Sequence, residues 1–406
     1  MRRIGFVLAV AVGILTSEAA LLISSYYVPL VRYYLTSPWT RNAVDDPVLG
    51  FRMSPYYPGH DKRGYRNNQF PSTSAVLAIG DSLTYGFAAP PTGSWPYQLQ
   101  LLSQKKVYNA GVGGYGPCEY EAVLDELLIL QPNAVIIGFY MGNDLSDVYK
   151  SIYLDGRCAH LRITDETVLG EIENVNKKGT LPEMAMRYGM ETDKARKNEN
   201  VHFSARRWLA EHSSLYGLAR SIQYAFANNS KIPLRDLDDS FEAAAKRPFR
   251  LAFNAVPEIR TVFRTPDLDS LAVNVNDPRI HEGLRLTQSI LLSINTKLKK
   301  RRVQLIVVLL HNKPYVYADI LRKYWPTAPK ELVDLTALEE NATRLIIRFL
   351  DENSITYVRT LSALRHRLSQ GEAAYPESDD HHPNSTGYLA IAESVLPFLG
   401  DTMRRQ

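Results

Sequence analysis

Two segments far apart in the chain carry residues that could act together in covalent catalysis. Residues 80–83 (Gly-Asp-Ser-Leu) follow a short apolar run, and residues 379–382 (Asp-Asp-His-His) lie about three hundred positions later. A serine hydroxyl is a weak nucleophile unless an imidazole accepts its proton and a carboxylate holds that imidazole in the correct tautomer. We predict Ser82 as the nucleophile, His382 as its base and Asp379 as the orienting acid. Such a set performs acyl transfer.

These residues also have ordinary structural interpretations. The Gly-Asp-Ser segment could be a turn that closes a strand and caps a helix. An isolated Asp–His pair is more often structural than catalytic. Asp380 and His381 are alternative acid and base candidates, which we rank lower on spacing alone.

Two further segments offer hydrogen-bond donors. Residues 109–116 (NAGVGGYG) are rich in glycine, which lets a backbone amide approach a ligand without side-chain interference. No Lys-Ser/Thr pair follows, so a P-loop is excluded, although a flexible turn is not. Residues 142–144 (Gly-Asn-Asp) present the neutral amide of Asn143, which could instead cap a helix.

The elements that must position these segments are five short β-rich apolar runs with helical patterns between several of them. Strands that alternate with helices predict an α/β fold with a parallel sheet covered on both faces. Ligands bind at the carboxyl ends of the strands in such sheets, so the four segments should converge there. The five runs are 75–79, 107–110, 134–140, 303–310 and 355–358.

The four segments together resemble the blocks of the SGNH, or GDSL, hydrolase superfamily, in the family's order. The blocks are 80–86 (GDSLTYG), 109–116, 142–144 and 379–384 (DDHHPN). The resemblance implies a flavodoxin-like three-layer fold over residues 75–400, with a five-stranded parallel sheet. It also implies ester cleavage by Ser82, His382 and Asp379, the last at the family's spacing. The expected oxyanion donors are the amides of Ser82 and Gly114 and the side chain of Asn143, and no metal or organic cofactor is required.

The N-terminal segment, about residues 1–35, suggests export. Arg2 and Arg3 precede two apolar runs separated by Thr16-Ser17-Glu18. The first run alone resembles a signal-peptide core. Joined across Glu18, the segment could instead span a membrane as a signal anchor, with the arginines on the cytoplasmic side. We expect a single-pass anchor with the catalytic domain in the periplasm or outside the cell, and keep a cleaved signal as the alternative.

Composition narrows the function classes further. The chain has 406 residues, a net charge of +4 and 45% hydrophobic residues. Its basic residues are scattered, so we expect no nucleic-acid partner. Cys118 and Cys158 could form one disulfide in an exported protein or remain free, because their spacing does not decide. Asn384-Ser385-Thr386 is a glycosylation acceptor pattern inside the expected catalytic loop, which favours a bacterial periplasm over a eukaryotic secretory route.

Two segments lie outside the blocks. Residues 36–74 are predicted to form an extended lead-in to the domain. Within it, residues 46–50 and 64–67 resemble those of bacterial membrane-anchored members of the SGNH superfamily. Residues 151–283 form a long insertion with an amphipathic segment at 205–226, which could be a lid or a docking surface.

The expected function is that of a serine esterase acting on short acyl esters, including those of carbohydrates. The alternatives are a cell-envelope polysaccharide O-acetyltransferase that uses the same residues and a non-catalytic envelope-assembly component. The sequence does not choose between water and a sugar as the acyl acceptor.

Overall fold

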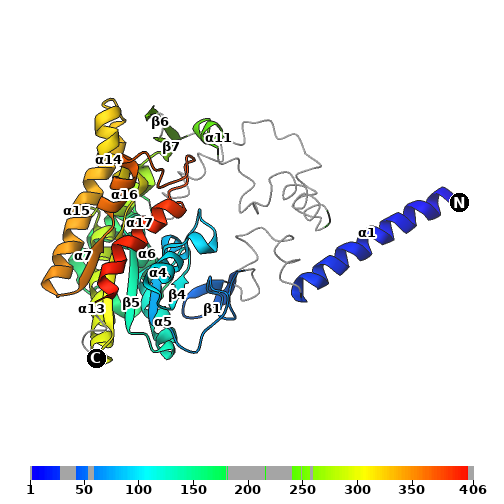
Figure 1. Cartoon of the computed structure of the whole chain (residues 1–406), viewed down its shortest axis with the longest axis horizontal. Coiled ribbons are helices and arrows are strands. Elements are labelled where there is room, and N and C mark those ends of the chain that lie inside the picture. The colour runs from blue at the N-terminus through cyan, green and yellow to red at the C-terminus, as the bar shows by residue number, and fades with distance from the viewer. Residues whose placement is uncertain are drawn as a thin grey trace.

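A five-stranded parallel sheet forms the centre of the fold (Figure 1). The computed structural model describes residues 2–27, 43–53, 59–179, 181, 215, 240–247, 249–256 and 259–400. The strand order is β4-β3-β5-β8-β9, which is the 2-1-3-4-5 order of flavodoxin-like sheets. The predicted fold class is confirmed. The strands are β3 (Val76–Gly80), β4 (Val107–Gly111), β5 (Ala134–Tyr140), β8 (Gln304–Leu310) and β9 (Thr356–Arg359).

The central strands are apolar because helices cover both faces of the sheet. Every residue of β3 and β5 is buried, as expected for central strands of a parallel sheet. Alternate residues of each strand enter two separate hydrophobic cores. One core packs against α5 (Pro117–Leu127), α13 (Pro278–Lys300) and α15 (Lys330–Glu352). The other packs against α4 (Trp95–Ser103), α14 (Lys313–Tyr324), α16 (Leu361–Ser369) and α17 (Ser385–Val395).

Helix α13 illustrates how the sequence specifies these elements. Asp277 caps its first turn by accepting from the amide of Arg279, and Pro278 occupies the first helical position. An apolar stripe, which includes Leu291 and Ile294, is buried against the sheet. Lys297, Lys299 and Lys300 complete the last turn, where cations favour the helix dipole.

Short elements carry or surround the functional loops. These are α3 (Ser82–Tyr85), η1 (Pro91–Gly93), η2 (Leu128–Leu130), α6 (Asp144–Tyr149), η3 (Lys150–Leu154), η4 (Ala159–Leu161) and η5 (Leu396–Leu399). The lead-in contains an antiparallel pair, β1 (Ala43–Asp46) and β2 (Gly50–Met53).

The described part of the insertion contains helices and an antiparallel hairpin. Its elements are α7 (Glu166–Asn176), α11 (Phe241–Ala245), β6 (Arg250–Val256), β7 (Ile259–Arg264) and α12 (Asp267–Val273). The hairpin contributes Phe253 and Phe263 to the core shared with α14. Apart from Leu215, the predicted amphipathic segment at 205–226 lies outside the described residues.

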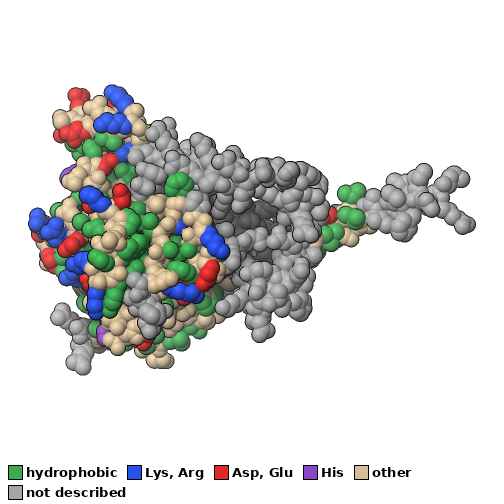
Figure 2. Space-filling view, turned by 90° about the horizontal axis from the view of Figure 1, so that it is seen from above, with side chains coloured by type: hydrophobic (Ala, Val, Ile, Leu, Met, Phe, Trp, Pro, Cys, Tyr) green, Lys and Arg blue, Asp and Glu red, His purple; other side chains and the backbone are tan. Residues whose placement is uncertain are grey.

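The N-terminal segment forms one helix, α1 (Arg2–Tyr27), which lies apart from the sheet in Figure 1. Within the described residues, no helix meets the length and apolarity that crossing a membrane requires. On the face shown in Figure 2, the described basic and acidic side chains are interspersed.

Candidate active site

Ser82 is the first residue of α3, with one residue between it and the carboxyl end of β3. The Asp81 carboxylate accepts from the backbone amide of Leu83 at 2.8 Å and thereby fixes the start of the short helix. Thr84 packs over the strand ends, and a Cβ at Gly80 or Gly138 would lie only 2.1 or 2.2 Å from its Oγ1. Glycine at these two positions therefore lets the turn sit directly on the sheet.

Ser82, His382 and Asp380 form a continuous hydrogen-bonded chain. His382 Nε2 lies 2.9 Å from Ser82 Oγ, and His382 Nδ1 lies 2.6 Å from Asp380 Oδ1. Because an ionised carboxylate only accepts hydrogen bonds, Nδ1 carries the proton and Nε2 is free to accept from the serine hydroxyl. The predicted pairing of Ser82 with His382 is thus present, and the geometry is the one that base activation of a serine requires.

The predicted acid is a different residue from the one that contacts the imidazole. Asp379, our choice on spacing, does not pair with His382, and that assignment is wrong. Its carboxylate lies 2.5 Å from Arg247 Nη1 and 2.5 Å from Arg250 Nε. Asp380 contacts the imidazole instead of Asp379. Its Oδ1 also accepts from the backbone amide of His382 at 3.0 Å. This two-residue turn brings the carboxylate beside the imidazole.

The electrostatics of the pair favour an ionised acid. Burial opposes ionisation of Asp380, but its hydrogen bond to His382 and the charges of His382 and His381 hold its pKa below the usual value. Burial lowers the pKa of His381, and Arg264 adds to this effect. His381 stacks on Tyr140 with an interplanar angle of 4°. It therefore occupies a packing position rather than that of the base.

The turn that carries the nucleophile also contains a buried acid. Burial, reinforced by the charge of Asp147, raises the pKa of Asp81 to about 7. Its Oδ2 lies 3.4 Å from Ser82 Oγ, which is a weaker contact than that of the imidazole.

The glycine-rich loop after β4 lies against Ser82. A Cβ at Gly113 would lie 3.5 Å from Ser82 Cβ and 2.7 Å from the Phe87 ring. Gly114 is exposed and has a φ of +87°, a conformation that favours glycine. The loop therefore brings the backbone of Gly113 to the reaction centre, while a Cβ at Gly114 would meet the Phe51 ring at 3.6 Å. The role of Gly114 as an oxyanion donor stays a prediction.

Asn143 precedes α6, yet its side chain does not cap that helix. Its Oδ1 is buried and has no hydrogen-bond partner among the described residues. Asp144 holds the loop instead, because its carboxylate accepts from Tyr120 Oη at 2.7 Å and from the Tyr140 amide at 2.9 Å. The Asn143 amide is thus not used for helix capping, and its role as an oxyanion donor also stays a prediction.

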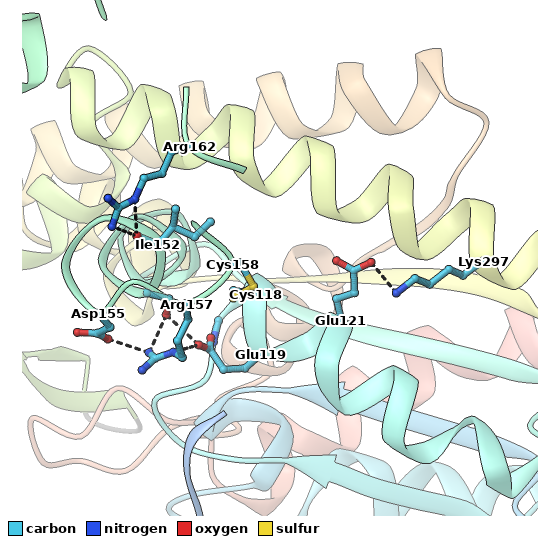
Figure 3. Close-up of a disulfide and its surroundings, with 11 residues drawn as sticks. Cys118, Glu119, Glu121, Ile152, Asp155, Arg157, Cys158, Arg162 and Lys297 are labelled. Atoms are coloured by element: carbon cyan, nitrogen blue, oxygen red, sulfur yellow. Dashed lines mark hydrogen bonds and ion pairs between the residues drawn. A yellow bond between two sulfur atoms is a disulfide. The ribbon is translucent and has the colours of Figure 1, made fainter. Parts of the chain in front are cut away.

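One buried glutamate connects the glycine-rich loop to the segment that follows α6 (Figure 3). Glu119 accepts from the Gly116 amide at 3.0 Å through one oxygen. Its other oxygen accepts from Ser151 Oγ at 2.9 Å and from Arg157 Nε at 2.8 Å. The sequence reasoning missed Glu119, although a Glu three residues after Gly116 is a capping signal.

A disulfide between Cys118 and Cys158 reinforces the same connection (Figure 3). The sequence left the pairing open, and the structure has the two residues bridged with their Cα atoms 6.4 Å apart. The bridge fastens the start of the insertion to the first turn of α5, directly after the glycine-rich loop. Gly116 also packs on α6, since a Cβ there would lie 3.2 Å from Asp147 Cβ.

The lead-in is hydrogen-bonded to the segment that carries the nucleophile. Arg66, within the block that resembles membrane-anchored members, donates to the carbonyl oxygens of Tyr85 and Gly86 at 3.0 and 2.7 Å and of Ala89 at 2.9 Å. These carbonyls lie at the end of α3 and just after it. The lead-in is therefore part of the site's scaffold.

Three consecutive side chains of this loop also fit one other kind of chemistry. Asp380, His381 and His382 offer ligand atoms that lie within 4.8 Å of one another, so they could hold a metal ion. Two of them already contact each other, and His382 contacts Ser82. A serine-based reaction uses this arrangement without a metal.

No family model and no curated protein matches the chain. Among solved structures, a protein of the G-D-S-L lipolytic family from Desulfitobacterium hafniense DCB-2 is 13% identical, with a TM-score of 0.35, over 79% of this chain and 97% of that one. Axe2, an acetylxylan esterase from Geobacillus stearothermophilus, is 14% identical, with a TM-score of 0.35, over 81% and 95%.

Proposed function

We propose that this protein is a serine esterase of the SGNH/GDSL type, with Ser82, His382 and Asp380 as its triad. The observation that supports this most directly is the pair of contacts of one imidazole, 2.9 Å to Ser82 Oγ and 2.6 Å to Asp380 Oδ1. The three side chains come from two sheet-edge loops separated by about three hundred residues. A chance surface pair would not place a free imidazole nitrogen on a serine at the end of a central strand.

The proposed reaction uses these contacts. Ser82 Oγ attacks the acyl carbon of an ester while His382 Nε2 takes the hydroxyl proton. His382 then returns the proton to the leaving alcohol, and water releases the acid from the acyl-enzyme in a second, equivalent step. Asp380 holds the imidazole and stabilises its charged form. The amides of Ser82 and Gly114 and the side chain of Asn143 would stabilise the oxyanion.

We propose short acyl esters, including O-acyl groups on carbohydrates, as the substrates. An O-acetyltransferase would use the same residues and pass the acyl group to a sugar hydroxyl. Hydrolysis needs no second binding site, so it is the simpler function for this set of residues. No further cofactor is part of the proposal.

We also propose that the protein acts outside the cytoplasm, attached to the inner membrane by its N-terminal segment. Helix α1 exposes Val12, Leu15 and Ile23, each more than half accessible. The Cys118–Cys158 bridge fits an oxidising compartment. Cell fractionation, with protease added to intact spheroplasts, tests this placement.

The decisive test of activity uses the full-length protein in mild detergent. The wild type should hydrolyse p-nitrophenyl acetate and should be labelled at Ser82 by a serine-directed phosphonate. Ser82→Ala should abolish both. Labelling that persists unchanged in this variant would remove Ser82 as the nucleophile. Slow hydrolysis that accelerates many-fold with an added oligosaccharide, and yields acylated sugar, would favour the transferase.

A further inference from the structure

Lys313 is one of the most deeply buried charged side chains in the described part of the chain. It is the first residue of α14, directly after the β8 strand and the Asn312 cap, and only 1% of its surface is exposed. Lysine is almost never fully buried unless its ammonium group has partners. Its environment therefore calls for a specific explanation.

The ammonium group is surrounded by backbone carbonyl oxygens. Lys313 Nζ lies 2.9 Å from the oxygen of Pro376, 2.7 Å from that of Ser378 and 3.2 Å from that of Asp380. A fourth oxygen, that of Val262 in β7, lies at 3.4 Å. The rings of Phe263 and Tyr375 lie 6.0 and 5.9 Å away, near the limit of cation–π attraction.

The three closest carbonyls belong to alternate residues of one loop, and the last belongs to the acid that contacts His382. The carbonyl of Glu377, between them, points elsewhere and accepts from the Val262 amide at 2.9 Å. This alternation fixes the loop's register. Shifting it by one residue would exchange Asp380 with Asp379, whose carboxylate now faces Arg247 and Arg250.

We infer that Lys313 is a positioning residue, which sets the register of residues 376–380 so that Asp380, and not Asp379, meets His382. The inference rests on the proposed esterase function for its kinetic consequence, but its structural consequence is independent of activity. Lys313 donates to the loop and does not touch the reacting atoms. It would act through Asp380.

The charges around Lys313 make this role sensitive to pH. Burial lowers the pKa of Lys313 to about 7, Arg264 of β7 acts in the same direction, and Asp380 and Asp379 oppose the shift. His381 lies in the same group of charges, since Lys313 contributes to the lowering of its pKa. The ammonium is thus present below this pKa and lost above it. Deprotonation would leave one donor fewer for the carbonyls.

The test compares the full-length wild type with Lys313→Met, which keeps the chain length and removes all donors. Lys105→Met is the matched control, because Lys105 also donates to a carbonyl, that of Leu399, outside this loop. We expect Lys313→Met to lower kcat roughly ten- to a hundredfold with little change in KM, as for a displaced catalytic group. Lys105→Met should leave kcat unchanged.

A double-mutant cycle separates positioning from general destabilisation. In an Asp380→Asn background, adding Lys313→Met should lower kcat by a further factor of less than about three, because the group through which Lys313 acts is already lost. Losses that multiply, or a folded Lys313→Met with kcat within about twofold of wild type, would overturn the inference.

Hydrogen exchange gives a readout without turnover. Amide exchange of residues 377–382 should accelerate in Lys313→Met and not in Lys105→Met, and unchanged exchange in these residues would also overturn the inference. If thermal melting shows that Lys313→Met does not fold, the same measurements are made on Lys313→Arg. Its kcat should equal that of the wild type at about pH 7 and should not fall at higher pH, because the guanidinium stays charged. An inactive, unlabelled wild type would overturn the proposed esterase instead, while the exchange experiment would still decide on Lys313.

Discussion

His382 Nδ1 lies 2.6 Å from Asp380, while the adjacent carboxylate of Asp379 is held by two arginines of the insertion. Neighbouring acids of the same type thus have separate environments within one loop. One orients an imidazole, and the other joins the loop to the β6–β7 hairpin. Identical substitutions at the two positions should therefore have different consequences.

Asp380→Asn should lower kcat by about four orders of magnitude, because the amide favours the wrong imidazole tautomer. Esterase assays under saturating substrate measure this loss, and circular dichroism checks the fold. Asp379→Asn is the matched control and should lower kcat far less, with its main effect on thermal stability. The opposite ranking would show that Asp379 is the functional acid after all.

Asn143→Ala should reduce kcat about a hundred- to a thousandfold with little change in KM, because an oxyanion donor acts mainly in the transition state. Its side chain does not cap α6, so the melting temperature should change little. Asn353→Ala removes an amide that donates to the Phe349 carbonyl at the end of α15, and serves as a control with normal kcat. Equal kcat values for the two variants would exclude Asn143 from the oxyanion site.

Much of the fold was predictable because it depends on local patterns. The β5 strand has the predicted bounds, Ala134–Tyr140, since a continuous apolar run between turn residues identifies a strand buried on both faces. Ser82 and His382 were identified because each lies in a short recognisable motif. Ser82 directly follows the turn after β3, and His382 lies in the loop between α16 and α17.

The acid and the bridging state of the cysteines were not predictable in the same way. The choice between Asp379 and Asp380 depends on Arg247 and Arg250, about 130 residues earlier, and on Lys313, more than 60 residues earlier. Cys118 and Cys158 are 40 residues apart. Nothing in local spacing encodes contacts over such separations.

The disulfide should stabilise the loops around the site. Replacing both cysteines, in Cys118→Ser/Cys158→Ser, should lower the free energy of unfolding by about 2–4 kcal/mol, a typical loss for one bridge. Thermal unfolding with and without reductant measures the effect. Reductant should lower the melting temperature of the wild type and leave that of the double variant unchanged. A reductant effect of equal size in both proteins would show that the bridge does not contribute.

The ion pairs of Asp379 should make stability depend on pH in a predictable direction. Burial opposes its ionisation, but Arg250, Arg264 and Arg247 together hold the pKa of Asp379 below its usual value. A lowered folded-state pKa contributes stability that is present above the unfolded value and is lost as pH falls through the folded value.

Asp379→Asn removes this contribution while keeping the side-chain shape. At about pH 7 the variant should be less stable than wild type by roughly 1–3 kcal/mol, allowing for the partial exposure of the arginines. Urea denaturation over a pH series should show this difference shrinking once the pH falls below about 4, where Asp379 of the unfolded chain is protonated. The lowered pKa of Asp380 is common to both proteins and cancels in the difference. A gap between the two proteins that stays constant down to about pH 2 would show that Asp379 contributes by packing and not through its charge.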